Sequence, residues 1–363
     1  MNDLVQKYDH WLENSGPAAL VIREQLMPVE GRDGVLFPAT FADTGYNIDK
    51  FDDGGNVCLI DSVGSQANRI EPIFMTKDYA GLVPQIVVQA GNKKVNLLEA
   101  GHRAGDAIIR CSELQQTLRA AFNNVLNGNA EPLARIAPTS LVFGVWDSRD
   151  TQAKLPRLVA STIRAYNVRP LTRSAQYVPA VDYNAEGLLE EPGDLRDAEG
   201  KVKSKHPFAQ RGFVHVPATG ALGGVIATGG IRRDATLHLA ALRLLSAGQD
   251  EAKSKALRRY ILSLALTAFT VPVTGYLRQG CNLVLDPENP LEFKEVFNDG
   301  TRNDVGITHT EAIVYAKAVA KEFGIDPERN LDEKKAPDRE VPFDKVLAKK
   351  DVSDAGGSKK KAK

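Results

Sequence analysis

The strongest structural signal in the sequence is a pair of helical runs joined at Gly248. They read "DATLHLAALRLLSAG" and "EAKSKALRRYILSLALTAF", and their apolar residues, such as Leu237, Ala241, Leu244 and Leu245, recur at helical spacing. Each run is therefore expected to bury one side and to expose the other. A chain of 363 residues, 43% of them hydrophobic, can bury a substantial core around these helices, as one elaborate domain or as two smaller ones.

Strands are expected on both sides of these helices. Branched residues predict a first strand over residues 18–29, and further strands are expected at "PQIVVQAG", "KKVNLLEAG", "TSLVFGVW", "GFVHVPA" and "VTGYLRQGCNLVLD". No period of about 20 to 50 residues recurs, which excludes a solenoid. Because strands and helices interleave, the sequence predicts an α+β or α/β fold.

Three further helices are marked by their first residues. "DSVGSQANRIEPIF" begins at an N-cap, Asp61 or Ser62, and "SELQQTLRAAFNNVLNGN" begins at Ser112. The last helix begins at Thr308, which forms a Thr-x-x-Glu capping box with Glu311.

Three other segments lack helical or strand periodicity. Residues 30–56 have the Gly, Pro, Asp and Asn density of an irregular insertion, and residues 183–211 are interpreted as a mobile loop or a hairpin tip. After about residue 332 the chain is rich in Lys, Asp, Glu and Pro, which predicts a charged, flexible tail over residues 332–363.

Composition excludes several classes of protein. Lysine plus arginine equals aspartate plus glutamate at 46 each, so any site for nucleic acid must be local. Three cysteines far apart argue against a disulfide framework and favour a reducing compartment. We find neither a secretory signal nor a run of about 18 apolar residues, and therefore expect a cytoplasmic protein that does not span a membrane.

Motifs of the common enzyme classes are missing as well. None of the six histidines has metal-ligand spacing from a cysteine or from another histidine. Neither a Gly-x-Ser-x-Gly elbow nor a Gly-x-x-x-x-Gly-Lys-Ser/Thr phosphate loop occurs. We therefore expect no catalytic residue, no metal and no cofactor.

Glycine is concentrated in "TGALGGVIATGG", after an expected strand and before an expected helix. Glycines in that position let a backbone approach a phosphate, and Arg232 and Arg233 follow directly. The spacing does not match Gly-x-Gly-x-x-Gly, so a dinucleotide site is disfavoured. A tight structural loop and a contact to a nucleic-acid backbone both stay open.

Polar side chains also gather on the expected helix "SVGSQANRIE". Spacing of three and four residues puts several of them on one face, opposite Val63, Ala67 and Ile70; they are Ser62, Ser65, Gln66 and Arg69. Hydroxyl, amide and guanidinium groups suit phosphate and 2′-hydroxyl contacts, although a solvated surface helix fits equally well.

The charge of the chain is uneven between Lys154 and Val181. Five cationic side chains occur there, four of them arginine, and no carboxylate follows until Asp182. Solvated faces usually mix both signs, and arginine gives bidentate phosphate contacts. This basic window therefore predicts an anionic partner, with nucleic acid favoured.

Four stretches of the sequence together resemble one protein family. They are "FPATF", "SVGSQANRIE", "SLVFGVWDSRDTQAKLPRLVASTIRAYNV" and "ATGALGGVIATGGIRRDATLHLAALRLL", and the similarity spans residues 18–324. The family is the RAMP-superfamily backbone subunit of the type I-G CRISPR surveillance complex, formerly type I-U, the seventh Cas protein of that subtype.

The resemblance implies an α+β fold with an RRM-like (ferredoxin-like) palm, extended by insertions into fingers and a thumb. Residues 1–331 would form this single elaborated domain. Copies of the subunit would stack as a helical filament along guide CRISPR RNA (crRNA), hold its backbone, and leave most bases free to pair with target DNA. The implied role is non-catalytic antiviral defence, together with the end-capping and large subunits of the Cascade complex.

Carried over residue by residue, the resemblance assigns RNA contacts to three groups. The helix supplies Ser65, Gln66, Asn68 and Arg69; the basic window and its approach supply Arg149, Lys154, Arg157, Arg164 and Arg169; the glycine-rich loop supplies Gly229, Gly230, Arg232 and Arg233. The thumb would come from residues 169–179 or from residues 183–211, and the sequence does not distinguish between them.

Other functions stay open. Related subunits of type III complexes cut target RNA with an aspartate in an early loop, and aspartates occupy a similar region here, at Asp33, Asp43, Asp49, Asp52 and Asp53. No motif selects one of them. The chain could instead be an RNA-processing or nucleotide-dependent α/β enzyme that uses residues 220–230, or a scaffold whose basic window meets an acidic protein.

Overall fold

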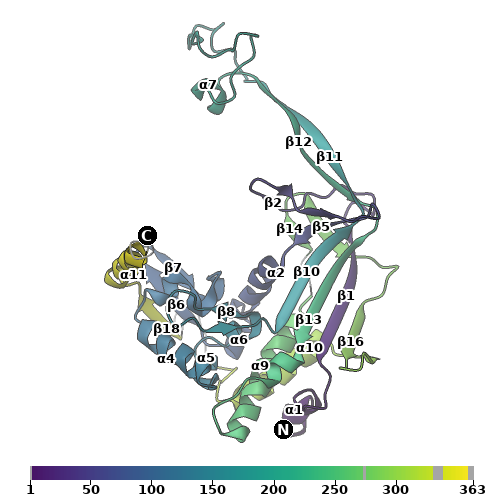
Figure 1. Cartoon of the computed structure of the whole chain (residues 1–363), viewed down its shortest axis with the longest axis vertical. Coiled ribbons are helices and arrows are strands. Elements are labelled where there is room, and N and C mark those ends of the chain that lie inside the picture. The colour runs from purple at the N-terminus through teal and green to yellow at the C-terminus, as the bar shows by residue number, and fades with distance from the viewer. Residues whose placement is uncertain (1, 273–274, 330–337, 359–363) are drawn as a thin grey trace.

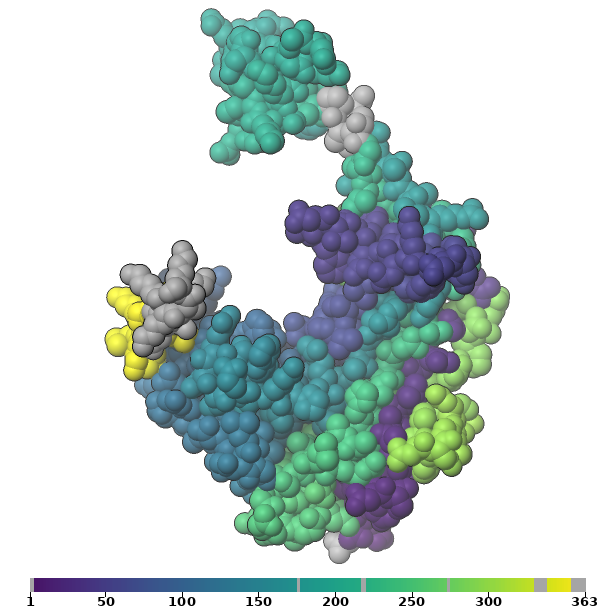
Figure 2. Space-filling view, viewed as in Figure 1, coloured from purple at the N-terminus to yellow at the C-terminus, as the bar shows by residue number. Residues whose placement is uncertain are grey.

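A curved body and a long projecting arm make up the molecule (Figure 1). The computed structural model describes residues 2–272, 275–329 and 338–358. The body contains a large antiparallel sheet, with a side lobe next to it. The arm is a hairpin of β11 (Val168–Tyr177) and β12 (Val216–Ala227). Figure 2 shows that the arm and the side lobe enclose a hollow.

The main sheet has nine strands. Seven follow the order β14-β15-β1-β13-β10-β5-β4, while β16 pairs with β1 and also with β17. Their bounds are β1 Ala19–Pro28, β4 Ile48–Lys50, β5 Asn56–Asp61, β10 Val159–Tyr166, β13 Ile231–His238, β14 Tyr276–Arg278, β15 Cys281–Leu285, β16 Glu292–Val296 and β17 Arg302–Asp304. The strands expected at residues 18–29 and 273–286 are confirmed, except that residues 273 and 274 lie outside the described residues.

Four central strands lie in the order β16-β1-β13-β10, each antiparallel to the next. Helix α2 (Val63–Ile70) lies between β1 and β10 in the chain, and α9 (Glu251–Thr270) lies between β13 and β16. Along β13, buried and half-buried side chains alternate. Both helices pack on the buried face, whereas the half-buried side chains form the other, open face. The fold is therefore α+β, as expected.

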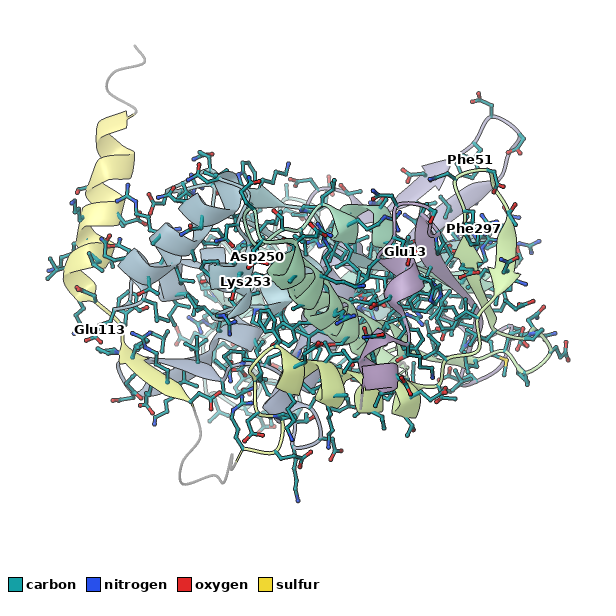
Figure 3. All side chains as sticks on the ribbon, turned by 90° about the horizontal axis from the view of Figure 1, so that it is seen from below. Glu13, Phe51, Glu113, Asp250, Lys253 and Phe297 are labelled. Carbon is teal, nitrogen blue, oxygen red and sulfur yellow. The ribbon has the colours of Figure 1, made fainter. Side chains whose placement is uncertain are left out.

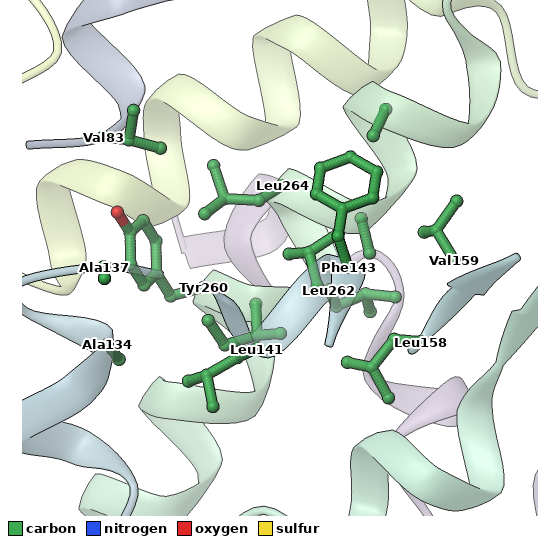
Figure 4. Close-up of a cluster of buried hydrophobic side chains, with 14 of the residues drawn as sticks. Val83, Ala134, Ala137, Leu141, Phe143, Leu158, Val159, Tyr260, Leu262 and Leu264 are labelled. Atoms are coloured by element: carbon green, nitrogen blue, oxygen red, sulfur yellow. The ribbon is translucent and has the colours of Figure 1, made fainter. Parts of the chain in front are cut away.

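Helix α9 organises the core of the body. Asp250 caps its first turn by accepting a hydrogen bond from the Lys253 backbone N–H at 3.0 Å, and Figure 3 shows this end in the middle of the molecule. Residues 259–269 are all buried, since the main sheet, the side lobe and α10 (His309–Glu322) surround them. Tyr260 stacks on Phe323 with ring centroids 4.4 Å apart. Figure 4 shows Tyr260 among residues of the side lobe, so one core joins the lobe to the sheet.

The side lobe consists of residues 71–155 and 338–358. In it β6 (Ile86–Ala90) pairs antiparallel with β7 (Lys93–Asn96) and parallel with β18 (Arg339–Pro342). Helix α11 (Lys345–Ser358) follows. Residues 338–358 are therefore ordered and do not form the flexible tail that the sequence predicts. Val341 is 2% exposed, and its strand β18 completes the sheet of the side lobe. The rest of that tail, residues 332–337 and 359–363, lies outside the described residues.

Shorter elements complete the chain. They are α1 Asn2–Gln6, η1 Asp9–Trp11, β2 Thr40–Phe41, β3 Gly45–Tyr46, η2 Glu71–Met75, η3 Ala80–Leu82, η4 Leu97–Glu99, η5 Arg103–Gly105, α3 Ala107–Arg110, α4 Gln115–Leu126, α5 Glu131–Ala134, α6 Thr139–Phe143, β8 Val145–Trp146, β9 Lys154–Leu155, α7 Pro207–Gln210 and α8 Leu239–Arg243. No helix in the described ranges is both long enough and apolar enough to cross a membrane.

Three expected elements differ in type or in start. "TSLVFGVW" is mainly helix α6 and not a strand, because a short apolar run that is buried on every side carries no period. Residues 234–238 belong to strand β13, since pairing with β1 and β10 on both sides overrides their helical spacing. Helix α4 begins at Gln115, three residues after Ser112, and Ser112 Oγ accepts from the Leu114 N–H at 3.2 Å. The N-cap Ser62 and the capping box of Thr308 and Glu311 are confirmed.

The arm unites two segments that the sequence left as alternatives. Residues 169–179 lie in or just after β11, and residues 183–211 form most of the tip that closes the hairpin. The glycine-rich run lies mainly in β12, followed by a tight turn into β13, so the expected loop before a helix is wrong. Beneath the arm, a second core of Leu36, Ile60, Ile163, Val225 and Ile231 anchors it to the main sheet.

Candidate nucleic-acid interface

A buried aspartate organises the start of α2. Asp61, the last residue of β5, is 1% exposed and accepts four side-chain hydrogen bonds. The donors are Ser65 Oγ at 2.8 Å, Gln66 Nε2 at 2.7 Å, Arg69 Nε at 3.2 Å and Arg278 Nη2 at 3.0 Å. Two guanidinium groups share one carboxylate, so the site keeps a net positive charge while each group is held in place.

Two of the residues expected to contact RNA are buried. Gln66 is 4% exposed, and its amide is engaged at both ends, by Asp61 and by the Ser161 hydroxyl at 2.9 Å. Arg233 is 3% exposed and forms an ion pair with Glu24. Helical spacing grouped Gln66 with Ser65 and Arg69, but its side chain points into the interface with β10. The buried side chains of Gln66 and Arg233 therefore position α2 and the main sheet, and they are not part of the exposed surface.

The first turn of α2 lies beside Arg157. Ser62 caps the helix by accepting from the Ser65 N–H at 3.2 Å. A Cβ on Gly64 would lie 3.9 Å from Nη2 of Arg157. No acceptor among the described residues pairs with the backbone N–H of Val63 or Gly64. Unpaired first-turn amides next to a guanidinium are suited to binding an anion.

A short hairpin of β8 and β9 continues this surface with three exposed cations, Arg149, Lys154 and Arg157. Lys154 pairs across the hairpin with Trp146 and places Nζ 5.2 Å from the centre of its ring. Throughout residues 2–272, 275–329 and 338–358, no carboxylate forms an ion pair with any of the three cations. We call these residues, with Ser65, Asn68 and Arg69, the α2–hairpin surface.

A buried ion pair lies under this surface. Arg103 Nε is 2.7 Å from Glu71 Oε2, and its Nη groups donate to Asn68 Oδ1 at 3.3 Å and to the Gly144 carbonyl at 3.2 Å. Burial raises the pKa of the Glu71 carboxyl to about 7, although Arg103 and Thr139 act to lower it. Arg103 has a φ of 52°, and it joins α2 to the side lobe beneath the exposed Asn68.

Other predicted residues lie on the open face of the main sheet. Arg164 and Arg232 are opposite each other in the register of β10 and β13, and Arg233 on the same strand points the other way. Arg232 is occupied: its Nε donates to both oxygens of Asp234 at 3.0 Å and its Nη2 donates to the Tyr166 hydroxyl at 2.8 Å. The sheet therefore separates Arg164 and Arg232 from the α2–hairpin surface.

The remaining predicted residues lie at the base of the arm. Arg169 is exposed near the start of β11, and Gly229 and Gly230 form the turn between β12 and β13. Gly230 has a φ of 82° and a Cβ on Gly229 would lie 2.9 Å from the Tyr166 carbonyl oxygen, so both glycines are required by the turn itself. This turn leads into a strand, so it lacks the helix amides of a phosphate loop.

The structure therefore brings together Ser65, Asn68, Arg69, Arg149, Lys154 and Arg157. It buries Gln66 beneath them and separates the other predicted residues from them. Sequence reasoning missed Asp61 and Arg103 as the buried groups that hold this surface. The apolar run before Asp61, residues 57–60, offered a weak signal, because a charge at the end of a buried strand is itself buried only when it is paired. The neighbours of Arg103 offered no such signal. Trp146 was seen as the end of a strand and not as an exposed ring.

Residues 20–170 are similar to the family described as CRISPR-associated protein GSU0053. The matched span is less than half of the chain and contains α2, the hairpin of β8 and β9, and β10. No curated protein matches the chain. The similarity supports a CRISPR-associated role, and it includes every residue of the α2–hairpin surface.

Proposed function

We propose that this chain is the crRNA-binding backbone subunit of a type I-G CRISPR Cascade complex. Copies of it would polymerise along the guide RNA and present the bases for pairing with target DNA, without catalysis by the subunit itself. The partners in this proposal are crRNA, other copies of the chain and the remaining Cascade subunits.

One observation carries the proposal: the α2–hairpin surface joins unpaired cations to unpaired backbone amides. Arg149, Lys154 and Arg157 have no carboxylate partner in the described ranges, and Arg157 lies at the first turn of α2. Guanidinium groups and helix amides both bind phosphate oxygens, and phosphates are alike in every RNA sequence. Such a surface suits a protein that must accept any guide.

The fold supports the same assignment. The central strands follow the chain in the order β1, β10, β13 and β16, with α2 after β1 and α9 after β13. Their spatial order, β16-β1-β13-β10, is that of a ferredoxin-like or RRM-like palm. In this proposal the arm is the thumb, and it contains both segments that the sequence offered for that role.

The first test is whether the protein binds single-stranded RNA, and through which side chains. We expect the purified protein to have a high ratio of absorbance at about 260 to 280 nm because it retains RNA, and the affinity to fall steeply with salt. Lys154→Glu with Arg157→Glu should weaken RNA binding at least about tenfold. The slope of log affinity against log salt concentration should fall by about two, because about two phosphate contacts are lost.

A matched control carries the same change of charge elsewhere. Arg302→Glu with Lys321→Glu also replaces two exposed cations, on β17 and α10. This pair should leave the affinity within about threefold of the unmodified protein. A protein that is free of nucleic acid and ignores RNA at low salt would contradict the proposal.

A further inference from the structure

The chain has two tryptophans, and they differ sharply in environment. Trp11 is 2% exposed, stacks on Tyr8 with ring centroids 4.8 Å apart, and donates its Nε1–H to Glu295 at 3.1 Å. Trp146 is 55% exposed on the short strand β8. Core packing explains Trp11, whereas most of the Trp146 ring is presented to solvent.

The hairpin holds Trp146 in a fixed position. Asp147, the next residue, is buried and accepts from the Thr151 N–H at 2.9 Å and from the Thr151 hydroxyl at 2.7 Å. The Asp147 N–H donates to the Ala153 carbonyl, which closes the hairpin directly behind Trp146. An ion pair of Arg119 with Asp150, at 3.2 Å, ties the turn to α4. A ring on such a rigid support loses little entropy when it binds a flat partner.

The surroundings of the ring are cationic. Lys154 covers one side of it with Nζ 5.2 Å from the ring centre, and Arg149 lies in the turn of the same hairpin. Arg157 packs on Gly144, two residues before Trp146, and reaches the first turn of α2. A site for an apolar peptide would be expected to have an apolar rim. A ring beside unpaired cations instead suits a ligand that combines a flat base with a phosphate.

We propose that Trp146 is a stacking platform for one nucleobase of single-stranded RNA, with Lys154 and Arg157 placed for the phosphates that flank this base. The proposal rests on the RNA-binding function proposed above and adds a base contact to the backbone contacts. Stacking needs the face of a base and not its hydrogen-bonding edge, so all four bases are expected to bind.

Intrinsic fluorescence tests the proposal on the unmodified protein, since Trp11 is buried and Trp146 is accessible. After any retained RNA has been removed, titration with a single-stranded RNA of about 12 nucleotides should quench tryptophan emission and protect the accessible component from acrylamide. Trp146→Ala should abolish this change and weaken binding about 5- to 100-fold, whereas Trp146→Phe should stay within about threefold.

An RNA with abasic sites separates stacking from phosphate binding. Loss of the bases should weaken binding to the unmodified protein and should have little further effect on Trp146→Ala. Equal affinity of Trp146→Ala and the unmodified protein for intact RNA would overturn the stacking proposal, while loss of binding in the Lys154→Glu and Arg157→Glu variant would still support the proposed function. Emission that changes when RNA-free protein is concentrated, and not when RNA is added, would assign Trp146 to a contact between copies and overturn the proposal. No binding by the unmodified protein would overturn both.

Discussion

Cations on the open face of the main sheet and cations on its helix side differ in their partners. On the open face, Arg232 donates to both oxygens of Asp234, and Arg23 lies 3.4 Å from the same carboxylate. On the helix side, the cations of the hairpin have no such partner among the described residues, and the carboxylates of Asp61 and Glu71 are buried beneath the surface. The first arrangement neutralises charge, whereas the second offers it to a ligand.

Aromatic side chains follow the same division. Tyr166 on the open face lies under Arg232, whose guanidinium is 4.9 Å from the ring centre. RRM domains that read RNA on their sheet need free aromatic rings there. Trp146, on the helix side, is mostly free. Under the proposed function, the comparison therefore favours the α2–hairpin surface over the open face as the site for RNA.

The largest expected effect comes from removing the charge that organises α2. Asp61→Asn leaves Arg69 and Arg278 without their shared carboxylate, and it should lower the free energy of unfolding by about 3 kcal/mol. Asp234→Asn, the equivalent change on the open face, should cost less than about 1 kcal/mol because its partners are solvated. Chemical denaturation of both variants measures the difference. Equal losses of unfolding free energy would show that the buried Asp61 and the solvated Asp234 contribute equally to stability.

Much of this difference between the open face and the helix side could not be predicted from the sequence. The capped start of α2, the strand β1 and the long helix α9 were predicted from local pattern, and the structure confirms these elements. The excess of cations after Lys154 is visible in the sequence itself. The face on which a cation points depends on strand register, and register depends on pairing with distant strands. Arg157 and Arg164 are seven residues apart in one window, yet they lie on opposite sides of the sheet.

The buried ion pair under the helix-side surface should also make the stability of the protein depend on pH. Burial raises the pKa of the Glu71 carboxyl to about 7 from an ordinary value of 4.5, so the folded protein holds a proton that the unfolded chain releases. Stability from this group is present at low pH and is lost as pH rises from 4.5 to about 7. The loss should be about 2 to 3 kcal/mol.

Glu71→Gln isolates this contribution, because glutamine cannot titrate. The difference in unfolding free energy between the unmodified protein and Glu71→Gln should change by that amount between about pH 5 and pH 8 and then level off. Denaturation at a series of pH values measures it. A difference that stays constant with pH would show that Glu71 is ionised throughout and that Arg103 outweighs the effect of burial.

A smaller effect should separate binding from folding at the first turn of α2. Gly64→Ala adds a Cβ at ordinary contact distance from Arg157, so the fold accommodates it, and alanine favours a helix over glycine by up to about 1 kcal/mol. The same methyl group occupies the space from which a phosphate would approach the Gly64 N–H. We expect unchanged or higher stability and RNA affinity reduced about threefold to tenfold. Unchanged RNA affinity would show that the first-turn amides of α2 do not contact the RNA.

The smallest expected effect tests most directly whether the open face and the helix side differ in RNA binding. Arg164→Glu reverses a charge on the open face, seven residues from Arg157 in the same basic window. The new carboxylate lies opposite Arg232 in the register, so the change should stabilise the sheet by a few tenths of a kcal/mol, about the value of a cross-strand charge pair. RNA affinity should fall less than about threefold, since only screened, long-range attraction is lost. Arg157→Glu, the same change on the helix side, should have a several-fold larger effect. Because neither replacement removes a buried partner, equal losses in affinity could not be attributed to unfolding, and they would place RNA on both faces of the sheet.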